Sequence, residues 1–315
     1  MESPQNIKKR LKSVGNIKKI TKAMEMVAVT KMRKAQEIAI ASRPYAFAAL
    51  DLLATVSTLD PIKLPPLLAQ RKVETVLFVV VTSDKGLAGA FNSSVFRKFE
   101  QHVKKTENEY TKEKKLYLPV GEKAYTYLLK KNVEIVKKFT QVGDFAELQQ
   151  VRPITDFIVK GFLEKQWDRV VVVSTHFRTA LKQEPHVRMV LPINFEQIKE
   201  TVQETIPERG KFADLIKEQH ISFIPNKENL KDFLIEPSAK DVLDKLAEHL
   251  FFVQVYDLIV EANASEHSAR RMAMKTASDN ASELGEALNL QYNKSRQSKI
   301  TTEIAEISAG AEALS

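Results

Sequence analysis

The residues most able to do chemistry lie in a short glycine-containing stretch, TSDKGLAGAFN, at positions 82–92. It follows an apolar run typical of a strand, and backbone amides at a helix start after a strand favour anions such as phosphate. The positions of Gly86 and Gly89, however, fit neither G-x-G-x-x-G nor G-x-x-x-x-G-K-[ST]. No acidic residue is placed about 20 positions later to bind a ribose. We therefore interpret the two glycines as residues of a tight turn, and a nucleotide-binding enzyme is the weaker alternative.

Histidine and cysteine give no further candidates for a catalytic or metal site. The sequence has six histidines and no cysteine, which excludes disulfides, thiolate catalysis and zinc–thiolate sites. His176 and His186 could face each other on neighbouring strands, but they supply only two ligands. Ser265 and Ser268 flank His267 in a predicted helix that lacks the turn needed to expose a nucleophilic serine. We predict a chain without catalytic, cofactor-binding or metal-binding residues.

The positive charge of the chain is concentrated in its N-terminal segment. Residues 1–35 carry ten Lys and Arg against Glu2 and Glu25, a net charge of +8 that equals the charge of the whole chain. Such a concentration predicts an acidic partner. A nucleic acid is the alternative, but residues 1–44 contain no Phe, Tyr or Trp to stack on bases. This segment would therefore bind phosphates without sequence preference.

No segment has the composition of a membrane span or a secretory signal. The longest apolar runs, at 76–81 and 250–253, are far shorter than the ~20 residues that a span needs. The Lys-rich N-terminus lacks the apolar core of a signal peptide. The sequence predicts a soluble chain that is peripheral to something larger.

Both ends of the chain are predicted to be long helices. Apolar residues recur there at spacings of three and four, and prolines are absent between Pro4 and Pro44 and after Pro237. Ser3 before Pro4 is typical of a helix start, and Ser238 is a candidate cap for the second helix. The predicted apolar stripes consist of Ile7, Leu11, Val14, Ile17, Met24 and Val27 at one end, with Ile20 adjoining, and of Met274, Ala277, Ala281, Leu284, Leu288, Ile300, Ile304 and Ile307 at the other.

The C-terminal helix is too long to be buried by its own chain. Roughly 70 residues at 1.5 Å each give about 105 Å, which exceeds the diameter of any domain of this size. Part of the helix must pair with the N-terminal helix, and part must project or enter another molecule. We expect the two helices to form an antiparallel coiled coil.

The middle of the chain is predicted to be α/β. Apolar runs rich in β-branched residues predict strands at 73–81, 114–121 and 169–177, with a possible edge strand at 186–191. Helical patterns alternate with these strands, one of them at 154–168, which predicts a mostly parallel sheet covered by helices.

The expected organisation has three parts. They are an N-terminal coiled-coil helix over 1–58, a central Rossmann-like α/β domain over 70–236, and a C-terminal coiled-coil helix over 238–315. Within the central part, the charged segment 196–236 is predicted to be irregular.

Three segments together resemble one protein family. They are IKKRLKSVGNIKKITKAMEMVAVTKMRKAQ at 7–36, TSDKGLAGAFN at 82–92, and the C-terminal stretch 261–314 that begins EANASEHSARRMAM. In this order and at these ends they resemble the γ subunits of F-type ATP synthases, over about a third of the chain. The middle is similar to that family in layout more than in sequence.

The resemblance implies a mechanical role in place of a catalytic one. In that family the terminal helices form an asymmetric antiparallel coiled coil, which turns as a shaft inside a ring of three α and three β subunits. An ion-driven membrane c-ring turns the shaft, and the asymmetry of the shaft drives the β sites in turn through binding, synthesis and release. The implied partners are the α, β and ε subunits and the c-ring, with one copy of this chain per complex, no cofactor and no specific nucleic acid. The implied location is the cytoplasmic face of a bacterial inner membrane, in preference to the mitochondrial matrix side.

The resemblance also implies contact residues. Met24 matches the position where the N-terminal helix passes the β-subunit catch loops, with a coiled-coil core residue as the alternative. Arg270 and Gln297 match polar positions implicated in coupling, and a solvated surface arginine is the alternative for Arg270. Further implied contacts are the basic residues Lys8, Lys9, Arg10, Lys31, Arg33 and Lys34, expected to face acidic β loops, and the polar residues Thr301 and Glu303. Arg271 departs from the family, in which methionine is usual at that position.

Overall fold

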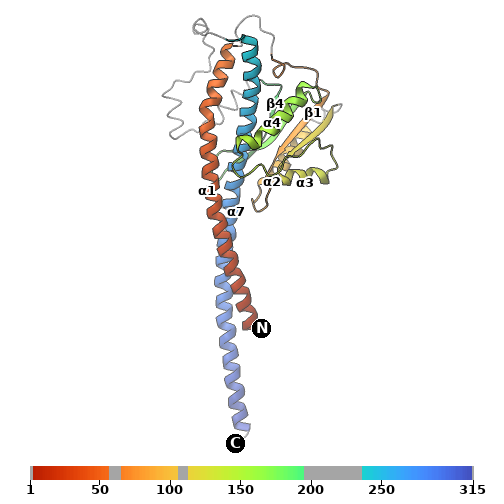
Figure 1. The fold of residues 1–315 in the computed structure, drawn as a ribbon. Coiled ribbons are helices and arrows are strands. Elements are labelled where there is room, and N and C mark those ends of the chain that lie inside the picture. Colours follow the sequence, from red (N-terminus) through yellow and green to blue (C-terminus); the bar gives the residue numbers. More distant parts are fainter. Residues whose placement is uncertain (1–2, 57–64, 106–112, 195–235, 314–315) are drawn as a thin grey trace. The chain divides into compact units, whose positions relative to one another are not determined.

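The computed structural model describes residues 3–56, 65–105, 113–194 and 236–313. The described elements are helix α1 (Pro4–Val56), strand β1 (Thr75–Val81), α2 (Phe91–Lys105), β2 (Lys114–Val120), α3 (Glu122–Lys130), α4 (Leu148–Leu163), β3 (Arg169–Phe177), β4 (Gln183–Leu191) and α7 (Ala239–Ala313) (Figure 1). The chain divides into two compact units. We call Met1–Val29 with Arg270–Ser315 the coiled-coil unit, and Thr30–Ala269 the α/β unit.

The sheet of the α/β unit has the strand order β2-β1-β3-β4. Strand β1 pairs in parallel with β2 and with β3, and β4 pairs antiparallel with β3. The predicted mostly parallel sheet is confirmed, and so is an edge strand near 186–191, although β4 begins three residues earlier. The three-part division of the chain predicted from its sequence stays a prediction.

Helices cover both faces of this sheet (Figure 1). Alternate residues of β1 enter two separate cores, because successive side chains of a strand point to opposite faces. Val76, Phe78 and Val80 pack with α2 and α3. Leu77 and Val79 pack with α4 and with the first part of α7. The double burial explains why β1 is a continuous apolar run.

The helix predicted over 154–168 is shifted in the structure. Helix α4 begins at Leu148, where the side-chain oxygen of Gln150 accepts a hydrogen bond from the backbone N–H of Glu147 at 3.0 Å. The helix continues through Pro153, and it ends at Leu163. Lys165 has φ 60°, a left-handed conformation that terminates helices, so α4 cannot reach residue 168.

The predicted starts of the long helices are confirmed. The Ser3 hydroxyl accepts a hydrogen bond from the backbone N–H of Asn6 at 3.4 Å, and the Ser238 hydroxyl accepts one from the N–H of Asp241 at 3.1 Å. Helix α1 continues through Pro44 to Val56. The segment 196–236, predicted to be irregular, lies outside the described residues except for its last position.

Candidate partner-binding surfaces

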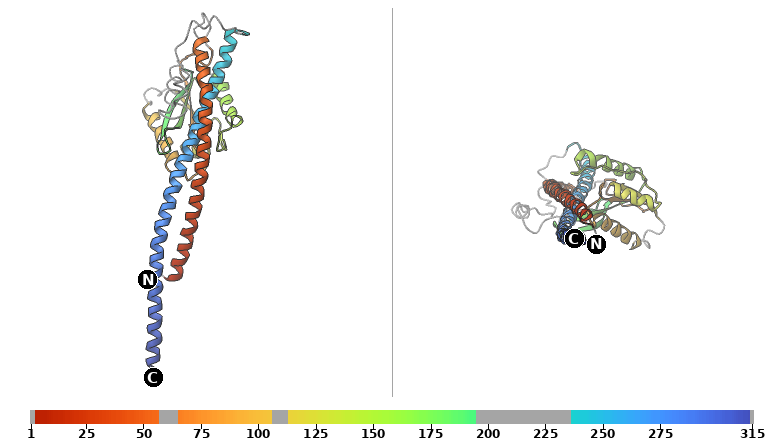
Figure 2. Two further views of the ribbon diagram at one scale, coloured as in Figure 1. Left: turned by 90° about the vertical axis from the view of Figure 1, so that its left-hand side faces the viewer. Right: turned by 90° about the horizontal axis from the view of Figure 1, so that it is seen from below.

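The two helices of the coiled-coil unit run antiparallel, as predicted (Figure 2). Lys18 Nζ donates a hydrogen bond to Ser282 Oγ at 2.9 Å. A Cβ added at Gly285 would lie 3.8 Å from Val14 Cγ1. Positions further toward the N-terminus of α1 therefore meet positions further toward the C-terminus of α7.

The seam between these helices repeats every seven residues, which is the period of a coiled coil. We define the seam by its buried and half-buried residues, which are Ile7, Leu11, Val14, Thr21, Glu25 and Ala28 on α1, and Met274, Ser278, Ala281, Leu288 and Ser295 on α7. Many of these side chains are small or polar. The seam therefore buries little apolar surface for its length.

The predicted apolar stripe of α1 is wrong beyond Val14. Ile17, Ile20 and Val27 are 51%, 59% and 54% exposed, and Met24 is half-buried beside the seam. The reason is geometric, because a seven-residue repeat that starts at positions 7 and 14 next reaches positions 21 and 28. The stronger apolar residues lie on a second line along the helix. We call Ile17, Ile20, Met24 and Val27 the outer stripe.

The two buried polar side chains that α1 contributes to the seam, Thr21 and Glu25, are satisfied within their own helix. The Thr21 hydroxyl donates to the carbonyl oxygens of Ile17 at 3.0 Å and Lys18 at 3.1 Å, and the Glu25 carboxylate pairs with Lys22 Nζ at 3.0 Å. These groups therefore avoid the penalty of an unpaired buried polar atom without joining the two helices. They add little to the specificity of the pairing.

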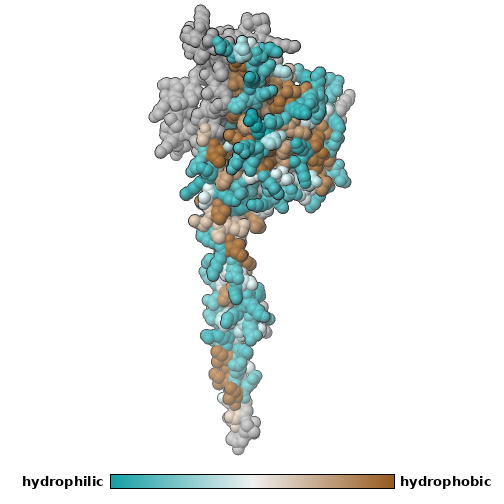
Figure 3. All heavy atoms as spheres, in the orientation of Figure 1, coloured by the Kyte–Doolittle hydropathy of each residue, from teal (hydrophilic) through white to brown (hydrophobic). Residues whose placement is uncertain are grey.

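The last turns of α7 extend past the N-terminal end of α1 (Figure 2). Every residue from 296 to 309 is exposed. Ile300, Ile304 and Ile307 were predicted to continue the coiled-coil stripe, but they are 44%, 60% and 72% exposed. Their spacing of four and three places them on one face of the helix, which we call the tip stripe. Figure 3 shows apolar surface on these last turns.

The basic residues implied as partner contacts lie mostly at the surface. Lys8, Lys9, Arg10, Arg33 and Lys34 are exposed. Lys31 differs from them, because it is half-buried and its Nζ lies 2.5 Å from Asp144 Oδ2 in the same chain. The sequence gives no signal for this pair, since 113 positions separate its members.

The polar residues implied as contacts lie along α7. Arg270 is half-buried, and Gln297, Thr301 and Glu303 are exposed. The contacts of Thr301 and Glu303 are local. The Thr301 hydroxyl donates to the carbonyl of Gln297 at 3.0 Å, and Glu303 pairs with Lys299 at 3.5 Å. These two contacts lie within α7, one helical turn apart in the sequence.

The loop 82–92 is a turn held by its own side chains. Asn92 Oδ1 accepts a hydrogen bond from the backbone N–H of Ser83 at 3.1 Å, and the Ser83 hydroxyl donates to the carbonyl of Lys85 at 2.7 Å. The Ser83 amide is therefore not available to an anion. Gly89 has φ 56°, as a tight turn requires, but the second left-handed residue is Leu87 and not Gly86.

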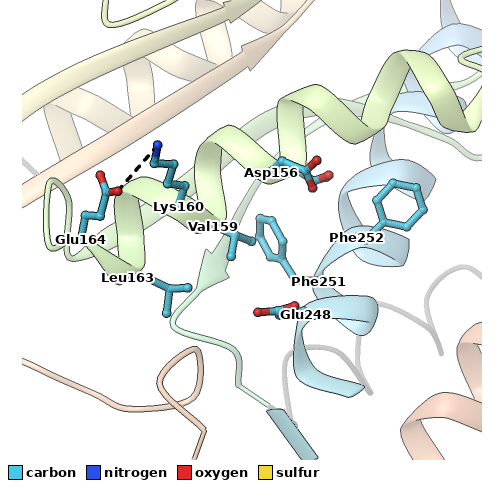
Figure 4. Close-up of a pocket in the computed structure, with 9 residues that line it drawn as sticks. Asp156, Val159, Lys160, Leu163, Glu164, Glu248, Phe251 and Phe252 are labelled. Carbon is cyan, nitrogen blue, oxygen red and sulfur yellow. Dashed lines mark ion pairs between the residues drawn. The ribbon is translucent and has the colours of Figure 1, made fainter. Parts of the chain in front are cut away.

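Two cavities of the α/β unit contain more than one carboxylate, but neither resembles a catalytic centre. A groove of about 360 Å³ between α4 and α7 is lined by Val159, Leu163, Phe251 and Phe252, with Asp156 and Glu248 at its margin and a Lys160–Glu164 ion pair of 3.8 Å (Figure 4). A cavity of about 330 Å³ lies at the carboxyl ends of β1 and β2. There Asp84 already accepts the N–H of Glu122 and Asp144 pairs with Lys31.

The histidines of the described residues have protein partners. The His176 and His186 rings lie 5.5 Å apart on neighbouring strands, as predicted. His176 Nδ1 lies 2.7 Å from Glu261 Oε2, and both side chains are buried. Within the described residues, no three His, Cys, Asp or Glu side chains are grouped so that they could hold a metal ion. Among the same residues, no helix is both long enough and apolar enough to pass through a bilayer.

The fold and its surfaces define a class of protein. It has an α/β unit and an antiparallel coiled coil. Within the described residues, Ile17, Ile20 and Val27 of the outer stripe and the whole tip stripe are exposed. A family model described as ATP synthase matches residues 3–314. The chain is 35% identical to the ATP synthase gamma chain of Trichlorobacter lovleyi over 314 residues, which is 100% of this chain and 99% of that one. It is also 35% identical to that of Moorella thermoacetica over 315 residues, 100% of each chain.

Two solved structures share the fold. One is the Euglena gracilis mitochondrial ATP synthase, with OSCP, F1 and c-ring, at a TM-score of 0.61 and 20% identity over 99% of this chain and 94% of that chain. The other is the central stalk and c-ring of the Tetrahymena thermophila mitochondrial ATP synthase, at a TM-score of 0.55 and 21% identity over 82% and 99%. This chain belongs to the ATP synthase family, and the relatives that it matches over its whole length are gamma chains.

Proposed function

We propose that this chain is the rotating shaft of an F-type ATP synthase. It couples ion-driven rotation of a membrane c-ring to sequential conformational changes at catalytic β subunits, and it has no active site of its own. An asymmetric shaft that turns past three equivalent sites gives each site a different contact at any moment. It thereby shifts their relative affinities, which is allostery supplied by a moving partner.

The observation that carries this proposal is the exposed apolar surface of the coiled-coil unit. Among the described residues, nine of the fourteen large apolar side chains that are strongly exposed belong to this unit. They include Ile17, Ile20 and Val27 of the outer stripe and all three isoleucines of the tip stripe. Contiguous exposed apolar surface marks an interaction site. A coiled coil with apolar residues outside its seam needs surrounding subunits to cover them.

The composition of this surface suits a contact that slides as the chain rotates. The tip stripe is narrow, and the residues beside it are short or polar, such as Thr301, Glu303 and Ser308. A narrow apolar line can slide against successive partners without locking into one deep pocket. The exposed Lys8, Lys9 and Arg10 on the first turns of α1 add positive charge, which supports contact with acidic loops of β subunits.

The partners proposed for the chain are three α and three β subunits around the coiled coil, and the ε subunit and c-ring at the α/β unit. One copy of the chain serves each complex. The complex is associated with a membrane, and we place this chain on the cytoplasmic face of a bacterial inner membrane. Met24, Arg270 and Gln297 are proposed coupling contacts.

The test is the composition of the complex that co-purifies with a tagged chain from membranes, measured by native mass spectrometry. One copy per three α and three β subunits is expected. The variant Ile304→Asp places a charge on the tip stripe and should lower the recovery of the ring subunits. The control variant Leu181→Asp changes a side chain that is 78% exposed in the α/β unit, and should leave recovery unchanged. Recovery of the chain without a ring of α and β subunits would overturn the proposal.

A further inference from the structure

One short loop joins both long helices within the α/β unit. The Asp144 carboxylate accepts a hydrogen bond from Lys31 Nζ of α1 at 2.5 Å. The Asp144 carbonyl oxygen accepts one from His267 Nε2 of α7 at 3.2 Å. Asn263, one turn earlier on α7, donates from its Nδ2 to the carbonyl oxygen of Gly143 at 3.2 Å. Two consecutive loop residues therefore hold α1 at one point and α7 at two.

The backbone of this loop fixes where Asp144 lies. Gln141, Gly143 and Ala146 have φ values of 61°, 80° and 46°, a region that residues with a side chain rarely adopt. Glycine is favoured at position 143 because its φ of 80° strains any residue with a side chain, and an added Cβ would also lie 2.8 Å from Gln150 Oε1. Such conformations persist only where the surroundings hold them. The loop is therefore a rigid support for Asp144.

The side chains of Lys31, Asp144 and His267 are partly or fully shielded from water, which strengthens the contacts between them. The His267 side chain is 2% exposed, and the Lys31 and Asp144 side chains are 28% and 34% exposed. Burial raises the pKa of Asp144, but the hydrogen bond from Lys31 and the charges of Lys31, His267 and Lys85 outweigh it, so the pKa lies below its ordinary value. The carboxylate is thus ionised at neutral pH.

Lys31 and His267 lie, in the sequence, one and two residues inside the limits of the α/β unit, Thr30 and Ala269. We propose that Asp144 is a positioning residue for rotational coupling, which clamps both shaft helices to the α/β unit so that torque on this unit reaches α1 and α7 together. The inference rests on the proposed function of the chain as a rotating shaft. It assigns Lys31 a contact within the chain, whereas the sequence resemblance implied a contact with β loops.

The test uses the complete ATP synthase in membrane vesicles. ATP hydrolysis is measured as phosphate release, and ion pumping is measured with a potential-sensitive dye that responds to any coupling ion. In Asp144→Ala and Lys31→Met, hydrolysis should stay within about twofold of the wild type, while pumping should fall by about threefold or more. Combining Lys31→Asp with Asp144→Lys restores opposite charges, and should recover most of the pumping.

The matched control is Glu37→Gln on the same helix. Glu37 is exposed, and its Oε2 lies 3.8 Å from Lys34 Nζ within α1. This variant should keep the wild-type ratio of pumping to hydrolysis. Asn263→Ala gives a second variant of the clamp, in case Asp144→Ala assembles poorly, and should lower the same ratio.

Two results would overturn the clamp. One is an unchanged ratio in Asp144→Ala, Lys31→Met and Asn263→Ala. The other is a parallel loss of hydrolysis, pumping and thermal stability that the charge swap does not relieve, since a purely structural role predicts that result. A wild-type complex that lacks this chain, or that hydrolyses ATP without pumping, would instead remove the proposed function itself.

Discussion

Leu288 and Leu290 offer a matched pair of substitutions that separates the seam of the coiled coil from its outer surface. They lie two residues apart on α7, and their side chains are 3% and 74% exposed. Alanine at either position changes helix propensity by the same amount, so the difference between the variants reports burial alone. Truncation of a buried leucine removes its transfer free energy and leaves a cavity, which together amount to about 2–5 kcal/mol.

The expected loss of stability for Leu288→Ala lies near the lower end of this range, at about 2–3 kcal/mol, because a two-helix seam lets water reach the space. Leu290→Ala should change the stability of the isolated chain by no more than about 0.5 kcal/mol. Hydrogen exchange followed by mass spectrometry gives the opening free energy for peptides within 3–29 and 270–296. Leu288→Ala should accelerate exchange in both peptide sets by roughly 30-fold or more, since 1.4 kcal/mol corresponds to a factor of ten.

The same two substitutions also test whether other subunits cover the outer surface of α7. In the assembled complex, Leu290→Ala should accelerate exchange or weaken assembly, because the proposed ring of subunits would cover this side chain. Equal effects of the two variants in the isolated chain would refute the assignment of the seam. An accelerated exchange confined to α7 in Leu288→Ala would refute its pairing with α1.

The remaining predictions concern the α/β unit. Gly161→Ala would place a Cβ against the ring of the buried Trp167. The free energy of unfolding should fall by about 3 kcal/mol, which is measured as a lower urea midpoint. An unchanged midpoint would contradict this packing. Burial raises the pKa of Asp168, but backbone N–H groups and Arg71 outweigh it, and the pKa lies below its ordinary value of 3.8. Its stabilisation is therefore present above pH 3.8 and is lost as the pH falls through the lowered value. Asp168→Asn should lower the melting temperature at pH 7 and differ progressively less from the wild type below pH 3.8, whereas a constant difference would contradict this linkage.

The α/β unit could be predicted from the sequence because its strands are buried on both faces by the chain itself. Each such strand is a continuous apolar run, and the alternation with helices follows from the need to cover both faces. The start of α4 could not be predicted so well. Pro153 suggests a boundary, but the side chain of Gln150 caps a helix that begins five residues earlier.

The sequence predicted that a coiled coil exists and that its helices run antiparallel, but it did not predict which residues form the seam. One sequence records which side chains are apolar, and it does not record whether this chain or another covers them. Ile17 and Ile20 therefore suggested the seam more strongly than Thr21 and Glu25, which form it. The sequence also does not show which positions far apart in the chain contact each other. Lys31 belongs to a basic segment that suggests a partner protein, but its acidic partner is Asp144.

The central claim is that this chain turns inside a ring of α and β subunits, and single-molecule rotation tests it most directly. The sequence has no cysteine, so a single Lys123→Cys substitution on the exposed side of α3 gives a unique site for a fluorescent or bead probe. With the ring fixed to a surface, we predict that ATP turns the probe in one direction, in steps that reflect three catalytic sites. A probe that stays still while the same complexes hydrolyse ATP would contradict the account.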